Sequence, residues 1–184
     1  MSSIYVVEVN ADGDKGYPDN SVVEVGICRV DTETLDYDSV YGELIAGDPL
    51  DMGKTSLDNL TDNAGIDVRE LYLGLPEEEV VADVRKILKG QDVACFDVRE
   101  TFMKYLLNIP WDLTKEAMIM PAVSIRLPGN LNLNREDPIQ NRIAAAYSAF
   151  CPGDPAEVGD GRRALNLAQM TSEILIKLRK EGRY

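Results

Sequence analysis

Two acidic residues occupy positions at which a carboxylate needs a chemical explanation. Glu8 lies within residues 4–9, a mostly apolar run, and a carboxylate buried there without a partner is costly. Asp97 directly follows the apolar residues 93–96, and an aspartate in that place can cap a helix that begins after it. Glu8 either faces water at an open strand end or has a buried partner, and the sequence leaves both alternatives open.

The other groups that could take part in catalysis are few. The chain contains no histidine, and its cysteines are Cys28, Cys95 and Cys151. Cys28 and Cys95 stand in apolar runs, where a thiol behaves as a small buried hydrophobe, whereas Cys151 lies in a predicted loop and is expected to be more exposed. Because no histidine is present to activate a thiol, the sequence does not predict a Cys–His nucleophile.

The first part of the chain predicts an antiparallel meander of three strands. Residues 3–9 are β-branched, aromatic and nearly continuous in apolar character, as in a strand buried on both faces. A loop with Gly13, Gly16 and Pro18 follows, and residues 21–30 and 36–45 give the second and third strands.

The rest of the chain alternates helices with short strands. Residues 76–89 predict a helix with an acidic first turn, and its apolar residues form one stripe. Further elements are expected at residues 93–96 (strand), 98–109 (helix), 118–127 (strand interrupted at Pro121), 139–150 (helix) and 161–180 (helix). This order favours an α/β fold, a mixed sheet covered by helices, in one domain spanning residues 1–184.

Short motifs in the same order resemble the ribonuclease-H-like 3'-5' exonucleases of the DEDD superfamily, proofreading type. Residues 8–13, Glu-Val-Asn-Ala-Asp-Gly, are similar to the Asp-x-Glu motif that ends the first strand of that family. Cys95-Phe96-Asp97 resembles the second motif, and residues 162–168 resemble the third, with Arg162 at the His position and Leu167 at the Asp position. The resemblance covers nearly the whole chain and implies a ribonuclease-H-like fold.

The departures from the family pattern affect the chemistry that the resemblance implies. Such enzymes use two Mg²⁺ ions held by four carboxylates, with a His or Tyr as the general base. Here the metal positions retain only Glu8 and Asp97, because Asn10 is neutral and Leu167 offers no oxygen. With no histidine in the chain, we expect no cofactor and near-complete loss of catalysis, or Mg²⁺ or Mn²⁺ dependence if activity survives.

Two further hypotheses concern the emptied motif positions. In the first hypothesis, Arg162 or Arg163 reaches Glu8 and Asp97 and puts a guanidinium where the family binds its metal ions. In the other, Asp12 and Asp14 rebuild a shifted metal site with Glu8. The residues expected to line a binding cleft are Asp12, Gly13, Phe96, Arg162 and Arg163.

Charge limits the partners of the protein. The formal net charge is -13, so a phosphate backbone is repelled unless a local basic patch opposes the average field. No apolar run is long enough for a membrane span, and the N-terminus lacks the basic start of a signal peptide, so we expect a cytoplasmic protein. The sequence does not determine the oligomeric state.

Three functions remain open. The first is a non-catalytic exonuclease-like module that binds a protein partner or a nucleic-acid end through the cleft. A divergent, still active Mg²⁺-dependent 3'-5' exonuclease acting on single-stranded DNA or RNA is the second. The third is an acidic interaction protein without an ancestral site. A cleft lined by basic and aromatic side chains favours nucleic acid, and an acidic or filled cleft favours a protein partner.

Overall fold

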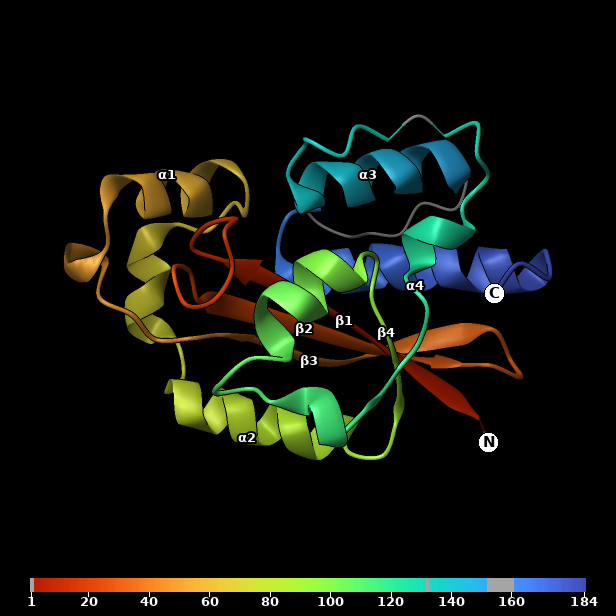
Figure 1. Cartoon of the computed structure of the whole chain (residues 1–184), viewed down its shortest axis with the longest axis horizontal. Coiled ribbons are helices and arrows are strands. Elements are labelled where there is room, and N and C mark those ends of the chain that lie inside the picture. The colour runs from red at the N-terminus through yellow and green to blue at the C-terminus, as the bar shows by residue number, and fades with distance from the viewer. Residues whose placement is uncertain (1, 132, 152–160) are drawn as a thin grey trace.

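The computed structural model describes residues 2–131, 133–151 and 161–184. Its centre is a five-stranded mixed sheet with the strand order β3-β2-β1-β4-β5 (Figure 1). The strands are β1 (Ser3–Ala11), β2 (Val22–Asp31), β3 (Asp36–Leu44), β4 (Asp92–Ala94) and β5 (Met118–Ile119). β1, β2 and β3 pair antiparallel, whereas β4 pairs parallel with both β1 and β5. The predicted meander and mixed sheet are therefore confirmed.

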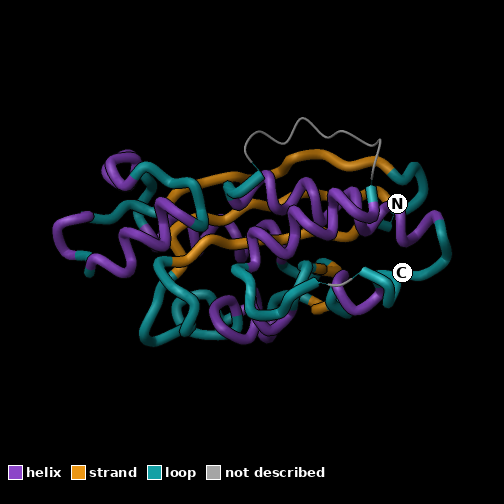
Figure 2. Tube along the Cα trace, turned by 90° about the horizontal axis from the view of Figure 1, so that it is seen from above, coloured by secondary structure: helices purple, strands orange, loops and turns teal. Residues whose placement is uncertain are grey.

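The three long strands run side by side along the length of the molecule, and both termini lie at one end (Figure 2). Side chains on successive residues of β1 point to opposite faces, as a pleated strand requires. Ile4 and Val6 pack on one face of the sheet, and Val7 and Val9 pack on the other. Glu8 has the same parity as Ile4 and Val6, so its carboxylate is directed into the first of these two cores.

Helices cover both faces of the sheet. The α-helices are α1 (Lys54–Asp62), α2 (Glu77–Leu88), α3 (Ile139–Phe150) and α4 (Ala164–Lys180). Shorter helical segments are η1 (Pro49–Asp51), η2 (Val68–Leu73), η4 (Leu113–Lys115) and η5 (Val123–Arg126), and η3 (Arg99–Leu106) has π-helical geometry. The core with Val7 and Val9 includes α2 and η3, whereas the core with Ile4 and Val6 includes α3 and α4.

Most helix predictions are confirmed, because apolar periodicity and the end signals agree. The predicted stripe of α2 is buried at Val80, Val81, Val84 and Leu88. α3 has the bounds that were expected, and α4 begins at Ala164 rather than at residue 161. The sequence pattern did not reveal α1, which buries only Leu60 and therefore lacks a clear apolar stripe.

Three local predictions are wrong. The segment 118–127 forms only the two-residue strand β5 and then η5, because Pro121 separates them and cannot donate a ladder hydrogen bond. The helix after Asp97 ends at Leu106, and Ile109 is 70 % exposed rather than part of a buried stripe. Cys151 is buried like Cys28 and Cys95.

None of the helices among the described residues has the length and apolar character needed to cross a membrane.

Candidate functional site

Glu8 is fully enclosed and forms hydrogen bonds with three parts of the chain. Its side chain is 1 % exposed. Oε1 accepts from the Phe96 backbone N–H at 2.6 Å and from the Thr171 hydroxyl of α4 at 3.0 Å, and Oε2 lies 3.2 Å from the Thr101 hydroxyl of η3. The carboxyl group thus joins β1 to α4, to η3 and to the end of β4.

Burial governs the protonation of this carboxyl group. Removal from water penalises the charged form and raises the pKa of Glu8 to about 8, although the hydrogen bonds from Phe96, Thr171 and Thr101 act in the opposite direction. The nearby Asp97 adds a small increase. Glu8 therefore favours the neutral acid at pH 7. Of the two alternatives that the sequence left open, the structure shows the one with buried partners.

Asn10 connects β1 to β2, to α3 and to the segment that precedes α4. Its amide Nδ2 donates to Glu24 Oε2 at 2.8 Å and to the Arg162 carbonyl at 2.9 Å. Its Oδ1 accepts from Gln140 Nε2 of α3 at 2.8 Å. Asn10 has 0 % exposure; its bonds to Glu24 and Gln140 are buried, and its bond to the Arg162 carbonyl is partly buried. An amide can donate and accept at once, whereas a carboxylate in this position could not donate to Glu24.

Glu24 of β2 holds the beginning of α4. Its Oε2 accepts from the Ala164 backbone N–H at 2.8 Å, and its Oε1 pairs with Arg163 Nε at 2.7 Å. Arg163 Nη1 also lies 2.9 Å from Glu70 of η2. A carboxylate that receives the first N–H groups of a helix also meets the positive end of its dipole. The Arg163 guanidinium is therefore committed to the support of α4.

Asp97 pairs with an arginine that the motif comparison did not include. Its Oδ2 lies 2.5 Å from Arg142 Nη2 of α3, and its Oδ1 accepts from the Arg99 backbone N–H at 3.0 Å, which caps the start of η3. The prediction that Arg162 or Arg163 would reach Glu8 and Asp97 is wrong. Arg162 Nη1 donates to the Asp62 carbonyl at 3.2 Å. Arg163 lies beside Glu24 and Arg162 beside the end of α1, whereas α3 brings Arg142 to Asp97.

The remaining motif residues are buried in the core or lie in the loop that precedes β2. Leu167 is fully buried in the core beneath α4, and the side chain of α4 that meets Glu8 is Thr171, one helical turn further on. Phe96 is also fully buried. Asp12 Oδ1 accepts from the Ser21 backbone N–H at 2.7 Å and closes the loop that precedes β2. Gly13 lines a cavity, and its carbonyl accepts from the Tyr105 hydroxyl at 2.7 Å.

This cavity of about 260 Å³ is lined on the β1 side by Val9, Ala11 and Gly13, and none of the motif positions Glu8, Asn10, Asp97, Arg162 and Leu167 lines it. We name it the central cleft; its charged side chains are Asp14, Glu100, Lys104, Arg135, Glu136, Asp137 and Arg142, and Thr101, Tyr105 and Gln140 also line it. Burial raises the pKa of Tyr105, so its hydroxyl stays protonated. Asp12, Arg162 and Arg163 do not line the cleft.

Sequence reasoning missed Thr101, Tyr105, Gln140, Thr171 and above all Arg142. The one available signal for Arg142 was its spacing: it stands four residues before Ala146, which is buried on the same face of α3. A charged residue on the buried face of a helix needs a partner. The sequence did not show that the partner would be Asp97.

The residues present do not fit the pair of divalent cations that the resemblance to the exonucleases implies. Mg²⁺ takes oxygen ligands with negative charge close to it. Glu8 favours its neutral form and already receives three hydrogen bonds, Asp97 is paired with Arg142, and both ends of the Asn10 amide are occupied. Within residues 2–131, 133–151 and 161–184, no group of three acidic or cysteine side chains is arranged to hold a metal ion.

Neither a family model nor a curated protein matches this sequence. Solved structures do match. The nuclease domain of 3'hExo, a DEDDh family member bound to rAMP, has a TM-score of 0.65 at 14% identity, over 98% of this chain and 93% of that domain. E. coli Exonuclease I in complex with a dA16 oligonucleotide has a TM-score of 0.67 at 10% identity, over 98% of this chain and 41% of that one. Exonuclease I from Methylocaldum szegediense has a TM-score of 0.65 at 14% identity, over 98% of this chain and 41% of that one.

These likenesses show that the chain has the ribonuclease-H-like fold of the DEDD 3'-5' exonucleases. The fold that the sequence motifs implied is thereby confirmed. Fold alone does not fix activity, which depends on the residues in the site.

Proposed function

We propose that this chain is an exonuclease-like module that binds a ligand through the cleft of its fold and does not hydrolyse phosphodiester bonds. The observation that carries the proposal is the commitment of the carboxyl groups. The Glu8 carboxyl group forms hydrogen bonds within the protein, and the Asp97 carboxylate forms an ion pair with Arg142. A two-metal mechanism needs both groups as negatively charged, unshared ligands.

The supply of general bases supports the same conclusion. Hydrolysis by this fold needs a group that takes a proton from water, usually His or Tyr. The chain has no histidine, and Tyr105 in the cleft donates to the Gly13 carbonyl with a raised pKa. Loss of the base alone typically lowers the rate by about 10² to 10⁴-fold.

The alternative is a divergent enzyme that still degrades single-stranded DNA or RNA with Mg²⁺ or Mn²⁺. The structural neighbours favour it, because they are exonucleases, and two of them have rAMP or an oligonucleotide bound. For this alternative to hold, a metal would have to displace Arg142 from Asp97 and ionise Glu8. The geometry of the site therefore favours the non-catalytic module.

The test is a degradation assay with purified protein, end-labelled single-stranded DNA and RNA, and either Mg²⁺ or Mn²⁺. We expect no metal-dependent shortening of the strands. The matched controls are Asp97→Ala, which removes the carboxylate beside Arg142, and Asp14→Ala, which removes an acid of the cleft loop. Digestion that depends on metal and is lost in Asp97→Ala but kept in Asp14→Ala would establish the active alternative.

A metal-binding measurement makes the same test without relying on turnover. An acidic protein attracts Mn²⁺ over its whole surface, so binding to wild type alone is uninformative. We expect wild type and Asp97→Ala to bind Mn²⁺ equally in titration calorimetry at physiological salt. A saturable site in wild type that Asp97→Ala removes would contradict the proposed function.

A further inference from the structure

A second, larger cavity shares Glu100, Arg135 and Arg142 with the central cleft and is also lined by Asp97. Its volume is about 520 Å³, and it lies between the first turn of η3, the segment from η5 to Gly129, and α3. We name it the arginine pocket, because Arg99, Arg135 and Arg142 all line it. Asp97 and Glu100 are its two carboxylates. Positive groups thus outnumber negative ones here, in a chain whose net charge is -13.

The two carboxylates of the arginine pocket are already neutralised. Asp97 pairs with Arg142 at 2.5 Å, and Glu100 pairs with Lys104 at 2.5 Å. No ion pair with another described side chain is recorded for Arg99 or Arg135. The pocket therefore presents positive charge that its own walls do not cancel.

A second, independent observation concerns Arg142, which lines the pocket. Its side chain is only 9 % exposed, and Asp97 accepts its one recorded hydrogen bond. Its Nε is a buried donor without an acceptor among the described residues. Buried donors nearly always have a partner, and the planar guanidinium is suited to binding the oxygens of a phosphate in pairs. An anion in the pocket would supply acceptors to this guanidinium.

The central cleft is a poorer place for an anion. Arg135 and Arg142 line both cavities, and Lys104 lines the cleft as well, but four carboxylates face the cleft: Asp14, Glu100, Glu136 and Asp137. Acids therefore outnumber bases in the cleft, whereas the reverse holds in the arginine pocket. The balance of charge places a phosphate on the side of Arg99.

We propose that the arginine pocket binds a phosphate monoester carried on an apolar or aromatic body, without any metal ion. Arg142 anchors the phosphate from below, and Arg99 and Arg135 approach it from the rim. Ile125, Leu127 and Pro128 line the same pocket and offer an apolar wall for the attached body. This inference rests on the proposed function, because in it a guanidinium binds the phosphate that a metal pair would bind in a nuclease.

The experiment measures binding by titration calorimetry in EDTA at low salt. The probes are inorganic phosphate, phenyl phosphate, adenosine 5'-monophosphate and a single-stranded oligonucleotide with a 5'-phosphate, so that the source of the phosphate is distinguished. We expect saturable binding of phenyl phosphate, and at least one of the two nucleotide probes should bind more tightly than inorganic phosphate. Failure of every probe to bind in EDTA, or binding only after Mg²⁺ is added, would overturn the proposal.

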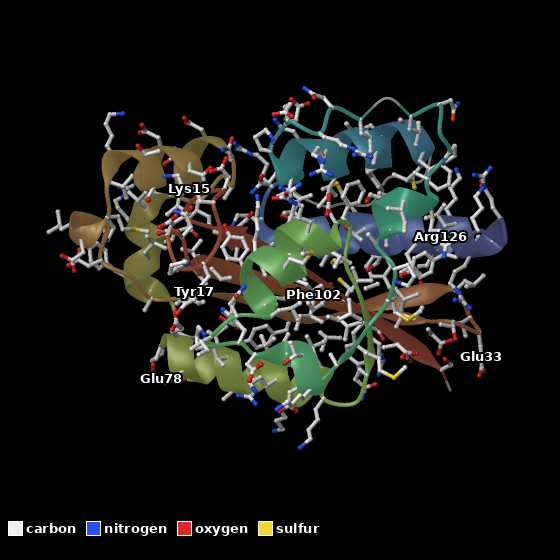
Figure 3. All side chains as sticks on the ribbon, in the orientation of Figure 1. Lys15, Tyr17, Glu33, Glu78, Phe102 and Arg126 are labelled. Carbon is white, nitrogen blue, oxygen red and sulfur yellow. The ribbon has the colours of Figure 1, made fainter. Side chains whose placement is uncertain are left out.

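Two substitutions locate the site. Arg142→Lys keeps the charge beside Asp97 but removes the planar fork, and Arg135→Gln removes an exposed positive group that does not contribute to the core. We expect each to weaken binding about tenfold, the usual value of one hydrogen bond to a charged group. The matched control is Arg126→Gln, an exposed arginine of η5 that does not line the pocket and is labelled in Figure 3. It should change the affinity less than twofold.

The outcomes separate this inference from the proposed function. Equal weakening by Arg126→Gln and Arg135→Gln would show a non-specific charge effect and refute the pocket. If Arg142→Lys does not fold, as judged by circular dichroism, Arg135→Gln alone decides. Metal-dependent degradation of the oligonucleotide would refute the non-catalytic module, whereas absence of binding in EDTA refutes only the arginine pocket.

Discussion

Substitution of Glu8 by glutamine tests the most unusual group in the structure. Glutamine has the shape of the neutral acid: its oxygen can accept from the Phe96 backbone N–H and the Thr171 hydroxyl, and its amide can donate to the Thr101 hydroxyl. It cannot ionise. Glu8→Gln therefore keeps the hydrogen bonds of the buried carboxyl group and removes only its titration.

The expected effect on stability follows from the pKa of Glu8, which is about 8 in the folded protein against an ordinary value of 4.5. The folded state holds this proton more tightly than the unfolded state does. The contribution of Glu8 to the free energy of unfolding is therefore fully present below pH 4.5 and is lost as the pH rises to 8. At about 1.4 kcal/mol for each pH unit, the loss amounts to about 5 kcal/mol at most.

The assay is urea denaturation of wild type and Glu8→Gln at pH 5, 6, 7 and 8. The free energy of unfolding of the variant should rise relative to wild type by about 1.4 kcal/mol for each pH unit between the two pKa values, about 3.5 kcal/mol in total from pH 5 to pH 8, and the difference should level off above pH 8. Glu33→Gln is the matched control, because Glu33 is exposed in the turn between β2 and β3, at the edge of the molecule in Figure 3. A wild-type minus Glu8→Gln difference that is constant from pH 5 to 8 would show that Glu8 is ionised in the native state and refute the reasoning.

Two further substitutions test the attachment of α4 to the sheet. Gly26→Ala should destabilise the protein by about 2 kcal/mol or more in urea denaturation, because the added Cβ would lie 2.3 Å from backbone atoms of Ala164 and Leu165. The control is Gly129→Ala, whose added Cβ would have no atom within 4 Å, and it should change stability by less than about 0.5 kcal/mol. Glu24→Ala should lower the free energy of unfolding by about 3 kcal/mol, because the substitution removes the acceptor of Asn10, of Arg163 and of the first turn of α4. A decrease below about 1 kcal/mol in the same assay would show that water replaces the carboxylate.

The sequence determined the layers of the fold because the signals for them are local. The continuous apolar character of residues 3–9 predicted a central strand, and β1 pairs on both sides, with β2 and with β4. The acidic first turn and apolar stripe of residues 76–89 predicted α2 within two residues at each end. Asp97 was expected to cap a helix and does accept from the Arg99 backbone N–H. Each of these patterns depends on residues a few positions apart.

Only the tertiary structure decided which side chains meet at the site. Glu8 bonds to Thr171 across 163 positions, and Asp97 pairs with Arg142 across 45. One hypothesis from the sequence placed Arg162 or Arg163 beside Asp97, because both stand in the third motif. A shift of one helical turn along α4 put Thr171 rather than Leu167 against Glu8, and periodicity cannot fix such a shift, since both residues lie on the same buried face. The energy of a buried charge depends on its partners in space, so the chemistry of the site was settled by packing.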